Sequence, residues 1–139
     1  MNKIQSRFGE IEYLPENLLH FPKGLIGFEN LRDFIIMPNK KEGPLFWIQS
    51  VDDPQIAFVM TDPSNFFLEY QVAATPADRT KLGIGEKDEV YCLSVVTVPP
   101  DRKITLNLMA PVLYAPSSNR ALQTILEKSP YTTRHPLPV

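Results

Sequence analysis

The residues best suited to chemistry in this sequence are few and widely spaced. His20 and His135 stand near opposite ends of the chain, and Cys92 is the single cysteine. A structural zinc site takes closely spaced Cys and His ligands, and no acidic segment has the spacing of an EF-hand calcium loop. Cys92 lies in the apolar run 90–96, where a free cysteine is usually a small buried residue. These residues predict no metal site and no bound cofactor.

Other partial motifs also have simple explanations. Gly83 and Gly85 match the start of a dinucleotide-binding loop, but Asp88 stands where its third glycine belongs. The sequence has no Gly-x-Ser-x-Gly nucleophile elbow. Asp52 and Asp53 are adjacent, so their side chains point apart at a strand end, and a turn role beside the following proline is favoured. We therefore predict a protein that is not an enzyme.

The size of the chain suits one folded unit. With 139 residues, 43% of them hydrophobic, we expect a single domain spanning 1–139. A core of that size needs no disulfide or metal ion to hold it. No apolar run approaches the roughly 20 residues that span a membrane, and no apolar signal region follows the charged N-terminus. We expect a cytoplasmic protein.

Proline content and short apolar runs set the fold class. The 14 prolines leave little room for long helices, and frequent short strands between turn signals are typical of sandwiches and barrels. We predict an all-β, single-domain, small β-barrel-like fold with one or two short helices. The expected strands are 4–7, 10–14, 17–21, 34–38, 45–51, 56–61, 89–98 and 104–113.

Two segments carry helix signals. Thr75, Pro76 and Asp78 have the residue types and spacing of a helix start with a capping box. The segment 119–126 begins with a plausible cap and contains good helix formers, but it equally suits a strand that closes a barrel. Periodicity does not decide between the two structures.

The segment 21–35, which follows the expected strand 17–21, combines a turn with a helical spacing. Pro22 and Gly24 suit the second and fourth positions of a β-turn. Phe28, Leu31 and Ile35 have helical spacing and predict about one turn of helix.

Charge is distributed unevenly along the chain. Residues 1–70 hold six Lys or Arg against ten Asp or Glu, a balance of −4, and residues 71–139 hold eight against six, a balance of +2. An acidic surface repels nucleic acid and attracts basic proteins. No basic residue lies between Lys41 and Arg79, a stretch that contains Glu42, Asp52, Asp53, Asp62, Glu69 and Asp78.

Aromatic residues cluster inside this acidic stretch. Phe66 and Phe67 cannot both face inward from one strand, because successive side chains alternate, although a turn or helix can bury both. An aromatic residue exposed beside Asp62 and Glu69 makes an apolar spot with an acidic rim, which suits a basic, partly apolar segment of a partner. The candidate partner-binding residues are Asp52, Asp53, Asp62, Phe66, Phe67, Glu69 and Tyr70. The alternative is a small RNA- or ligand-binding β-barrel, which normally interleaves aromatics with Lys and Arg.

Segments along nearly the whole chain resemble the FliW family of bacterial flagellar assembly factors. They are 20–29 (HFPKGLIGFE), 46–54 (FWIQSVDDP), 57–59 (AFV), Asp62-Pro63 with Phe67 and Tyr70, Thr105, 107–111 (NLMAP), Gln123, Tyr131 and 134–137 (RHPL). The chain departs from the family at Ala115 and Ala121, where an Asn and a Gly are common.

The resemblance implies a single all-β barrel without enzyme activity that binds two protein partners. One is cytoplasmic flagellin, and the other is CsrA, a regulator that binds messenger RNA and represses translation, including that of flagellin. The freed assembly factor binds CsrA and relieves repression allosterically. The resemblance also favours a strand for 123–126. His135 is expected to be packed and hydrogen-bonded near the chain end, and His20 to be structural at the start of a tight turn.

Overall fold

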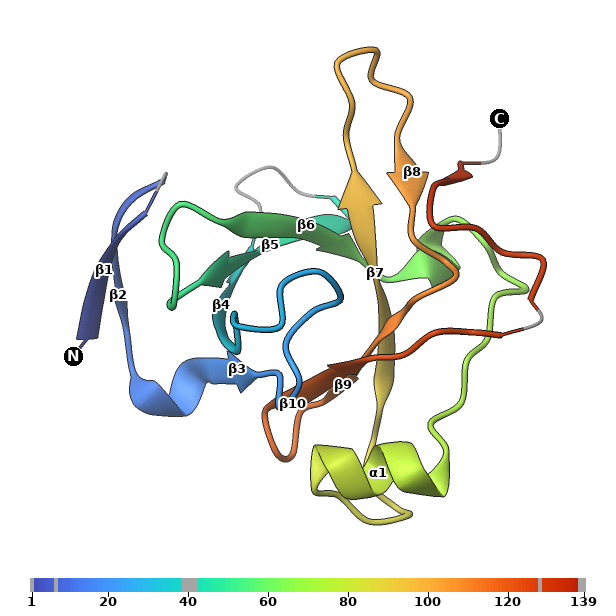
Figure 1. The fold of residues 1–139 in the computed structure, drawn as a ribbon, viewed down its shortest axis with the longest axis horizontal. Coiled ribbons are helices and arrows are strands. Elements are labelled where there is room, and N and C mark those ends of the chain that lie inside the picture. The colour runs from blue at the N-terminus through green and yellow to red at the C-terminus, as the bar shows by residue number, and fades with distance from the viewer. Residues whose placement is uncertain (1, 7, 39–42, 128, 138–139) are drawn as a thin grey trace.

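The protein folds around a closed seven-stranded β-barrel, which confirms the all-β expectation (Figure 1). The computed structural model describes residues 2–6, 8–38, 43–127 and 129–137. Around the barrel the strand order is β7-β6-β5-β4-β3-β10-β9, and the pairing of β9 with β7 closes the sheet on itself. β3 and β10 pair in parallel, whereas the other barrel neighbours pair antiparallel.

Most strands lie within a few residues of the predicted runs, and the exception is the expected strand 104–113. The barrel strands are β3 (Leu18–His20), β4 (Asp33–Pro38), β5 (Leu45–Ser50), β6 (Ala57–Thr61), β7 (Tyr91–Thr97), β9 (Val112–Ala115) and β10 (Arg120–Gln123). Outside the barrel, the described residues form β1 (Asn2–Ser6), β2 (Gly9–Tyr13), β8 (Thr105–Leu106) and β11 (His135–Pro136). The helical elements are α1 (Pro76–Leu82) and two 3-10 turns, η1 (Pro15–Asn17) and η2 (Pro63–Asn65).

Aromatic and aliphatic side chains fill the barrel. Phe21 and Phe34 are fully buried, and their rings meet edge to face with centroids 5.2 Å apart. Ile48 and Met60, from the neighbouring strands β5 and β6, belong to the same buried cluster. A barrel of this size has just enough interior for side chains to fill it. Large apolar residues at inward positions therefore make the barrel a packed core rather than a container.

The loop between β3 and β4 lies across the barrel in the centre of Figure 1. The N–H of Gly24 closes the expected β-turn with a 3.0 Å hydrogen bond. The helical turn expected from Phe28, Leu31 and Ile35 is wrong, because Phe28 and Leu31 close separate turns and Ile35 already belongs to β4. Leu25 and Leu31 are buried in the core. Apolar residues of this loop pack against the core at intervals that match those of a helix, although the loop forms turns and no helix.

The expected strand over 104–113 is also wrong, because the chain breaks it into β8 and β9. Val96 of β7 pairs with Leu106, and Leu93 pairs with Val112, so three residue steps on β7 match six on the returning chain. The side-chain oxygen of Asn107 accepts the N–H of Ala110 at 3.0 Å inside the break. Such a bulge turns the strand away from its neighbour, and here it frees β8 to pair with β11 outside the barrel.

Within the ambiguous segment 119–126 the chain forms the strand β10 and not a helix, because β10 pairs with β3 on one side and with β9 on the other. The strand that the resemblance favoured for 123–126 is wrong in its bounds, since β10 ends at Gln123. Backbone hydrogen bonds from Thr124 and Leu126 continue this pairing beyond the strand. The two departures from the family pattern, Ala115 and Ala121, are both fully buried in the barrel wall. Tertiary pairing of an ambiguous sequence therefore overrides its helix propensity.

Helix α1 confirms its sequence signature. The Thr75 hydroxyl accepts the N–H of Asp78 at 3.0 Å, and the Asp78 carboxylate accepts the N–H of Thr75 at 2.9 Å. Leu82 is fully buried and packs with Leu113 and Leu122 of the barrel wall. No helix in the described part of the chain has the length and apolar character needed to cross a bilayer.

Candidate functional site

The segment that follows β6 carries most of the candidate residues. Asp62 caps η2, and its carboxylate accepts the backbone N–H of Ser64 at 2.9 Å and the Ser64 hydroxyl at 2.7 Å. Phe66 and Phe67 both donate their N–H groups to the carbonyl oxygen of Pro63. This tight turn explains how two successive phenylalanines are both partly buried, as the sequence predicted for a turn.

Two segments distant in sequence meet at these phenylalanines. The ring of Phe67 lies 5.3 Å from the ring of His135, and the ring of Tyr70 lies 4.8 Å from that of Tyr131. Tyr131 and His135 also contact each other, with centroids 5.6 Å apart. Figure 1 shows the corresponding green and red segments side by side at the right of the barrel. Aromatic pairs prefer this edge-to-face arrangement, which adds stability beyond the buried area.

Tyr70 anchors the cluster to the barrel. Its side chain is 4% exposed, and its hydroxyl donates a 2.7 Å hydrogen bond to the carbonyl oxygen of Leu108. Burial raises the pKa of Tyr70 well above its usual value, and electrostatic repulsion from Cys92 and Tyr131 adds to the effect. The hydroxyl therefore stays neutral near pH 7 and acts as a hydrogen-bond donor.

A surface pocket opens over this cluster. It has a volume of about 470 Å³ and is lined by Phe66, Phe67, Leu68, Glu69, Tyr70, Tyr131 and His135. Leu68 is 86% exposed at its edge, and Glu69 is also exposed. We call this the aromatic pocket. It combines ring walls, an exposed leucine and the Glu69 carboxylate. Asp62, the other acidic residue that the sequence placed beside an exposed aromatic, caps η2 and is not among the lining residues.

Asp52 and Asp53 do not reach this pocket. The Asp52 carboxylate accepts the backbone N–H groups of Arg32 and Asp33 at 2.8 and 3.0 Å, and that of Asp53 accepts the N–H of Gln55 at 3.1 Å. Both residues lie in the turn before β6, and the aromatic pocket follows β6. A five-residue strand spans roughly 16 Å, so the seven candidate residues form two separate groups. The turn role that the sequence favoured for Asp52 and Asp53 is confirmed.

Three residues that line the pocket, Leu68, Tyr131 and His135, were not among the candidates, and the last two come from the C-terminal segment. The only sequence signal for Tyr131 and His135 was their place in the C-terminal pattern of the family. His135 is packed as expected, and its Nδ1 atom is buried without a hydrogen-bond partner among the described residues. His20, in contrast, has a structural role, since its Nδ1 lies 2.8 Å from a carboxylate oxygen of Asp33.

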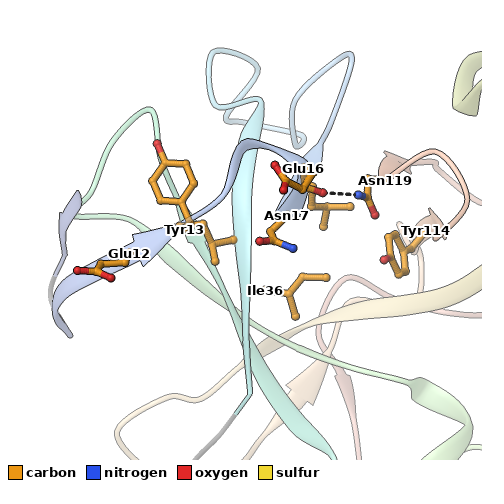
Figure 2. A pocket seen from close by; sticks show the side chains of 9 residues that line it. Glu12, Tyr13, Glu16, Asn17, Ile36, Tyr114 and Asn119 are labelled. Carbon is orange, nitrogen blue, oxygen red and sulfur yellow. Dashed lines mark hydrogen bonds between the residues drawn. The ribbon is translucent and has the colours of Figure 1, made fainter. Parts of the chain in front are cut away.

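A second hollow lies between η1, β4 and β9, with a volume of about 400 Å³ (Figure 2). It is lined in part by Asn17, Ile36 and Tyr114, and a 2.8 Å hydrogen bond joins the Asn119 amide to the backbone of Glu16 at its edge. The remaining acidic and phenolic groups of the lining do not converge. Figure 2 shows the side chains of Glu12 and Tyr13 directed away from the centre, and Glu12 forms an ion pair with Lys3.

The described residues contain no group of three or more His, Cys, Asp or Glu side chains placed to hold a metal ion. Fold and site together define a class: a small closed β-barrel with an aromatic pocket and an exposed leucine on its outer surface.

Comparison with known proteins shows the family to which the chain belongs. The FliW protein family matches residues 2–137. A flagellar assembly factor FliW from Syntrophotalea carbinolica is 67% identical over 135 residues, which cover 97% of this chain and 96% of the relative. FliW 2 from Desulfotalea psychrophila is 61% identical and covers 99% of this chain and 91% of its own. The chain therefore belongs to the FliW family of flagellar assembly factors.

The fold agrees with that family. A crystal structure of a flagellar assembly factor FliW superimposes with a TM-score of 0.89 at 27% identity, over 99% of this chain and 98% of the other.

Proposed function

We propose that this protein binds flagellin in the cytoplasm and, when free of flagellin, binds CsrA and relieves its repression of flagellin synthesis. The observation that carries the proposal is membership of the flagellar assembly factor family along nearly the whole chain. In this proposal the protein acts by binding alone, as one domain spanning 1–139, without catalysing a reaction and without contacting nucleic acid directly.

Charge supports the proposal. CsrA binds messenger RNA, so its binding surface has to attract phosphate, and an acidic protein next to that surface repels phosphate without covering each contact. The stretch from Glu42 to Asp78 contains no Lys or Arg, and Glu69 is exposed beside the aromatic pocket. This arrangement suits an allosteric or non-competitive antagonist.

The pocket supplies the apolar part of the proposed contact. Binding energy at protein interfaces concentrates in a few aromatic and apolar anchors that become fully desolvated. Leu68 is 86% exposed and projects from a segment whose aromatic side chains are held by ring contacts and by the hydrogen bond of Tyr70. A rigid platform of this kind loses little conformational entropy on binding.

Calorimetric titration with CsrA and, separately, with flagellin tests the proposal. We expect binding to both partners, and displacement of one by the other in a competition titration. Binding to neither partner by a folded sample rejects the proposal. Direct RNA affinity that falls steeply with salt would instead support the RNA-binding barrel.

Charge variants test the surface. Glu69→Lys should slow association with the partner and weaken its salt dependence. Asp62 caps η2, so Asp62→Asn, which keeps an oxygen acceptor, is the appropriate second change. Glu86→Lys makes the same charge change on the exposed loop after α1 and serves as the control. Equal association rates for Glu69→Lys and the parent at low salt would remove Glu69 from the interface.

A further inference from the structure

The rings of the aromatic pocket meet edge to face and are not stacked in parallel. Its three ring pairs meet at interplanar angles of 75°, 77° and 68°, so neighbouring rings stand nearly perpendicular to each other. Three of these rings, those of Phe67, Tyr131 and His135, are only partly buried. The rings therefore bound an open space of about 470 Å³ instead of closing it.

The electrostatic character of this space favours a cation. The face of an aromatic ring carries negative partial charge and attracts an ammonium or guanidinium group. Glu69 contributes a carboxylate at the edge, and no Lys or Arg is found among the described lining residues. The buried Tyr70 hydroxyl donates its hydrogen bond to the carbonyl oxygen of Leu108, so it is not available to the occupant of this space.

The edge of the pocket indicates the size of the occupant. Leu68 stands 86% exposed at the opening. Burying the exposed Leu68 side chain stabilises a complex only when the occupant has an apolar surface large enough to remove the leucine from water. A free small cation cannot do this, whereas a protein that inserts one basic side chain also brings apolar atoms against the edge. Long basic side chains suit such a site because their hydrocarbon stems pack on apolar surface while the charge stays at the end.

We propose that the aromatic pocket receives one Lys or Arg side chain of the basic, RNA-binding partner CsrA, between the rings of Phe67, Tyr131 and His135, with Glu69 beside its charge and Leu68 against an apolar neighbour. This assignment rests on the proposed function for the existence of a protein partner. It makes Tyr131 and His135 binding residues in addition to the residues that the sequence singled out.

Variants of Tyr131 separate ring chemistry from folding. Tyr131→Leu removes the aromatic face, and Tyr131→Phe keeps it. We expect Tyr131→Leu to weaken CsrA binding about fivefold to tenfold and Tyr131→Phe to bind CsrA like the parent. Unfolding curves for both variants check that each remains folded. Equal affinities for Tyr131→Leu and Tyr131→Phe, both folded, would overturn the assignment.

A probe titration tests the pocket without the partner, including the case in which Tyr131→Leu fails to fold. Acetyl-arginine amide is added to the unmodified protein, with acetyl-norleucine amide as the uncharged control. We expect arginine alone to shift the NMR ring signals of Phe67, Tyr131 and His135. Identical effects of the two probes, or none, would overturn the pocket assignment. An arginine-specific effect in a protein that binds neither CsrA nor flagellin would reject the proposed function while supporting the pocket.

Discussion

The hydroxyl of Tyr70 donates a 2.7 Å hydrogen bond to the backbone carbonyl oxygen of Leu108. This contact joins the segment after β6 to the break between β8 and β9. Leu108 is itself fully buried, so its carbonyl oxygen lies far from bulk water. The position of the aromatic pocket therefore depends on an interaction between residues 38 positions apart in the sequence.

Tyr70→Phe should lower the free energy of unfolding by about 1–2 kcal/mol. The substitution keeps the ring but leaves a buried carbonyl without its donor, and unpaired buried polar groups are costly. Urea unfolding measures the change. Tyr70→Leu, which also removes the ring contact with Tyr131, should cost more. An unchanged midpoint for Tyr70→Phe would mean that water replaces the hydroxyl.

Gly24→Ala should be among the most damaging single changes in the loop over the barrel. Gly24 has φ +68°, and an added Cβ would lie 2.6 Å from the Cα of Glu29 and 2.7 Å from the carbonyl oxygen of Phe28. Left-handed strain and overpacking together predict a loss of about 3–5 kcal/mol. The backbone atoms in contact cannot rotate away as a side chain would. Thermal or urea unfolding measures this loss.

Gly27→Ala is the matched control for that change. Gly27 also has positive φ, +87°, but an added Cβ would have no heavy atom within 4 Å. Only the conformational cost remains, so we expect a loss of about 1–2 kcal/mol. Equal losses at the two glycines would show that the loop relaxes around Gly24.

Asp52→Ala should reduce stability because the carboxylate holds the loop before β4. It accepts two backbone N–H groups, from Arg32 and Asp33, and hydrogen bonds to a charged group predict a loss of about 1–2 kcal/mol. Asp52→Asn keeps an acceptor oxygen and should lose less. If Asp52→Ala leaves stability unchanged but weakens CsrA binding, the carboxylate faces the partner and not the loop.

Cys92 should be a slow nucleophile. Burial raises the pKa of Cys92 to about 11, and the nearby Asp62 carboxylate pushes it in the same direction. At pH 8 the native thiol should react with iodoacetamide on the order of a hundredfold more slowly than the unfolded thiol, and the rate should rise with pH up to about 11. Rapid native labelling at pH 8 would contradict this burial.

The same shift predicts a stability change in alkaline solution. Below pH 9 the thiol is protonated in both the folded and the unfolded states, so the contribution of Cys92 to stability is constant. As pH rises from about 9 to about 11, the unfolded thiol ionises first, and the folded state loses stability. Cys92→Ala should remove this part of the decline. The part that comes from the raised pKa of Tyr70 should remain.

Features that depend on residues close together in the chain, such as helix caps and turns, could be predicted from the sequence. Thr75 and Asp78 lie three residues apart and cap α1 with each other, so their interaction needs no distant partner. Asp53 was recognisable as a turn residue for the same reason, as was the turn that ends at Gly24. The contact of the Asp52 carboxylate with the backbone of Arg32 and Asp33 is not local and was not predicted. Composition and proline content were sufficient for the all-β class, and the ordered segments along the chain were sufficient for the family.

Tertiary structure decided what depends on distant pairing. The strand β10 formed within the segment 119–126 because β3 and β9 pair with it on both sides. The apolar spacing at Phe28 became a set of turns, with Leu25 and Leu31 packed in the core. The candidate residues fall into two groups because β6 separates Asp52 and Asp53 from the aromatic pocket. Tyr131 joined Tyr70 through packing across 61 positions of sequence, and periodicity carries no information about contacts at that separation.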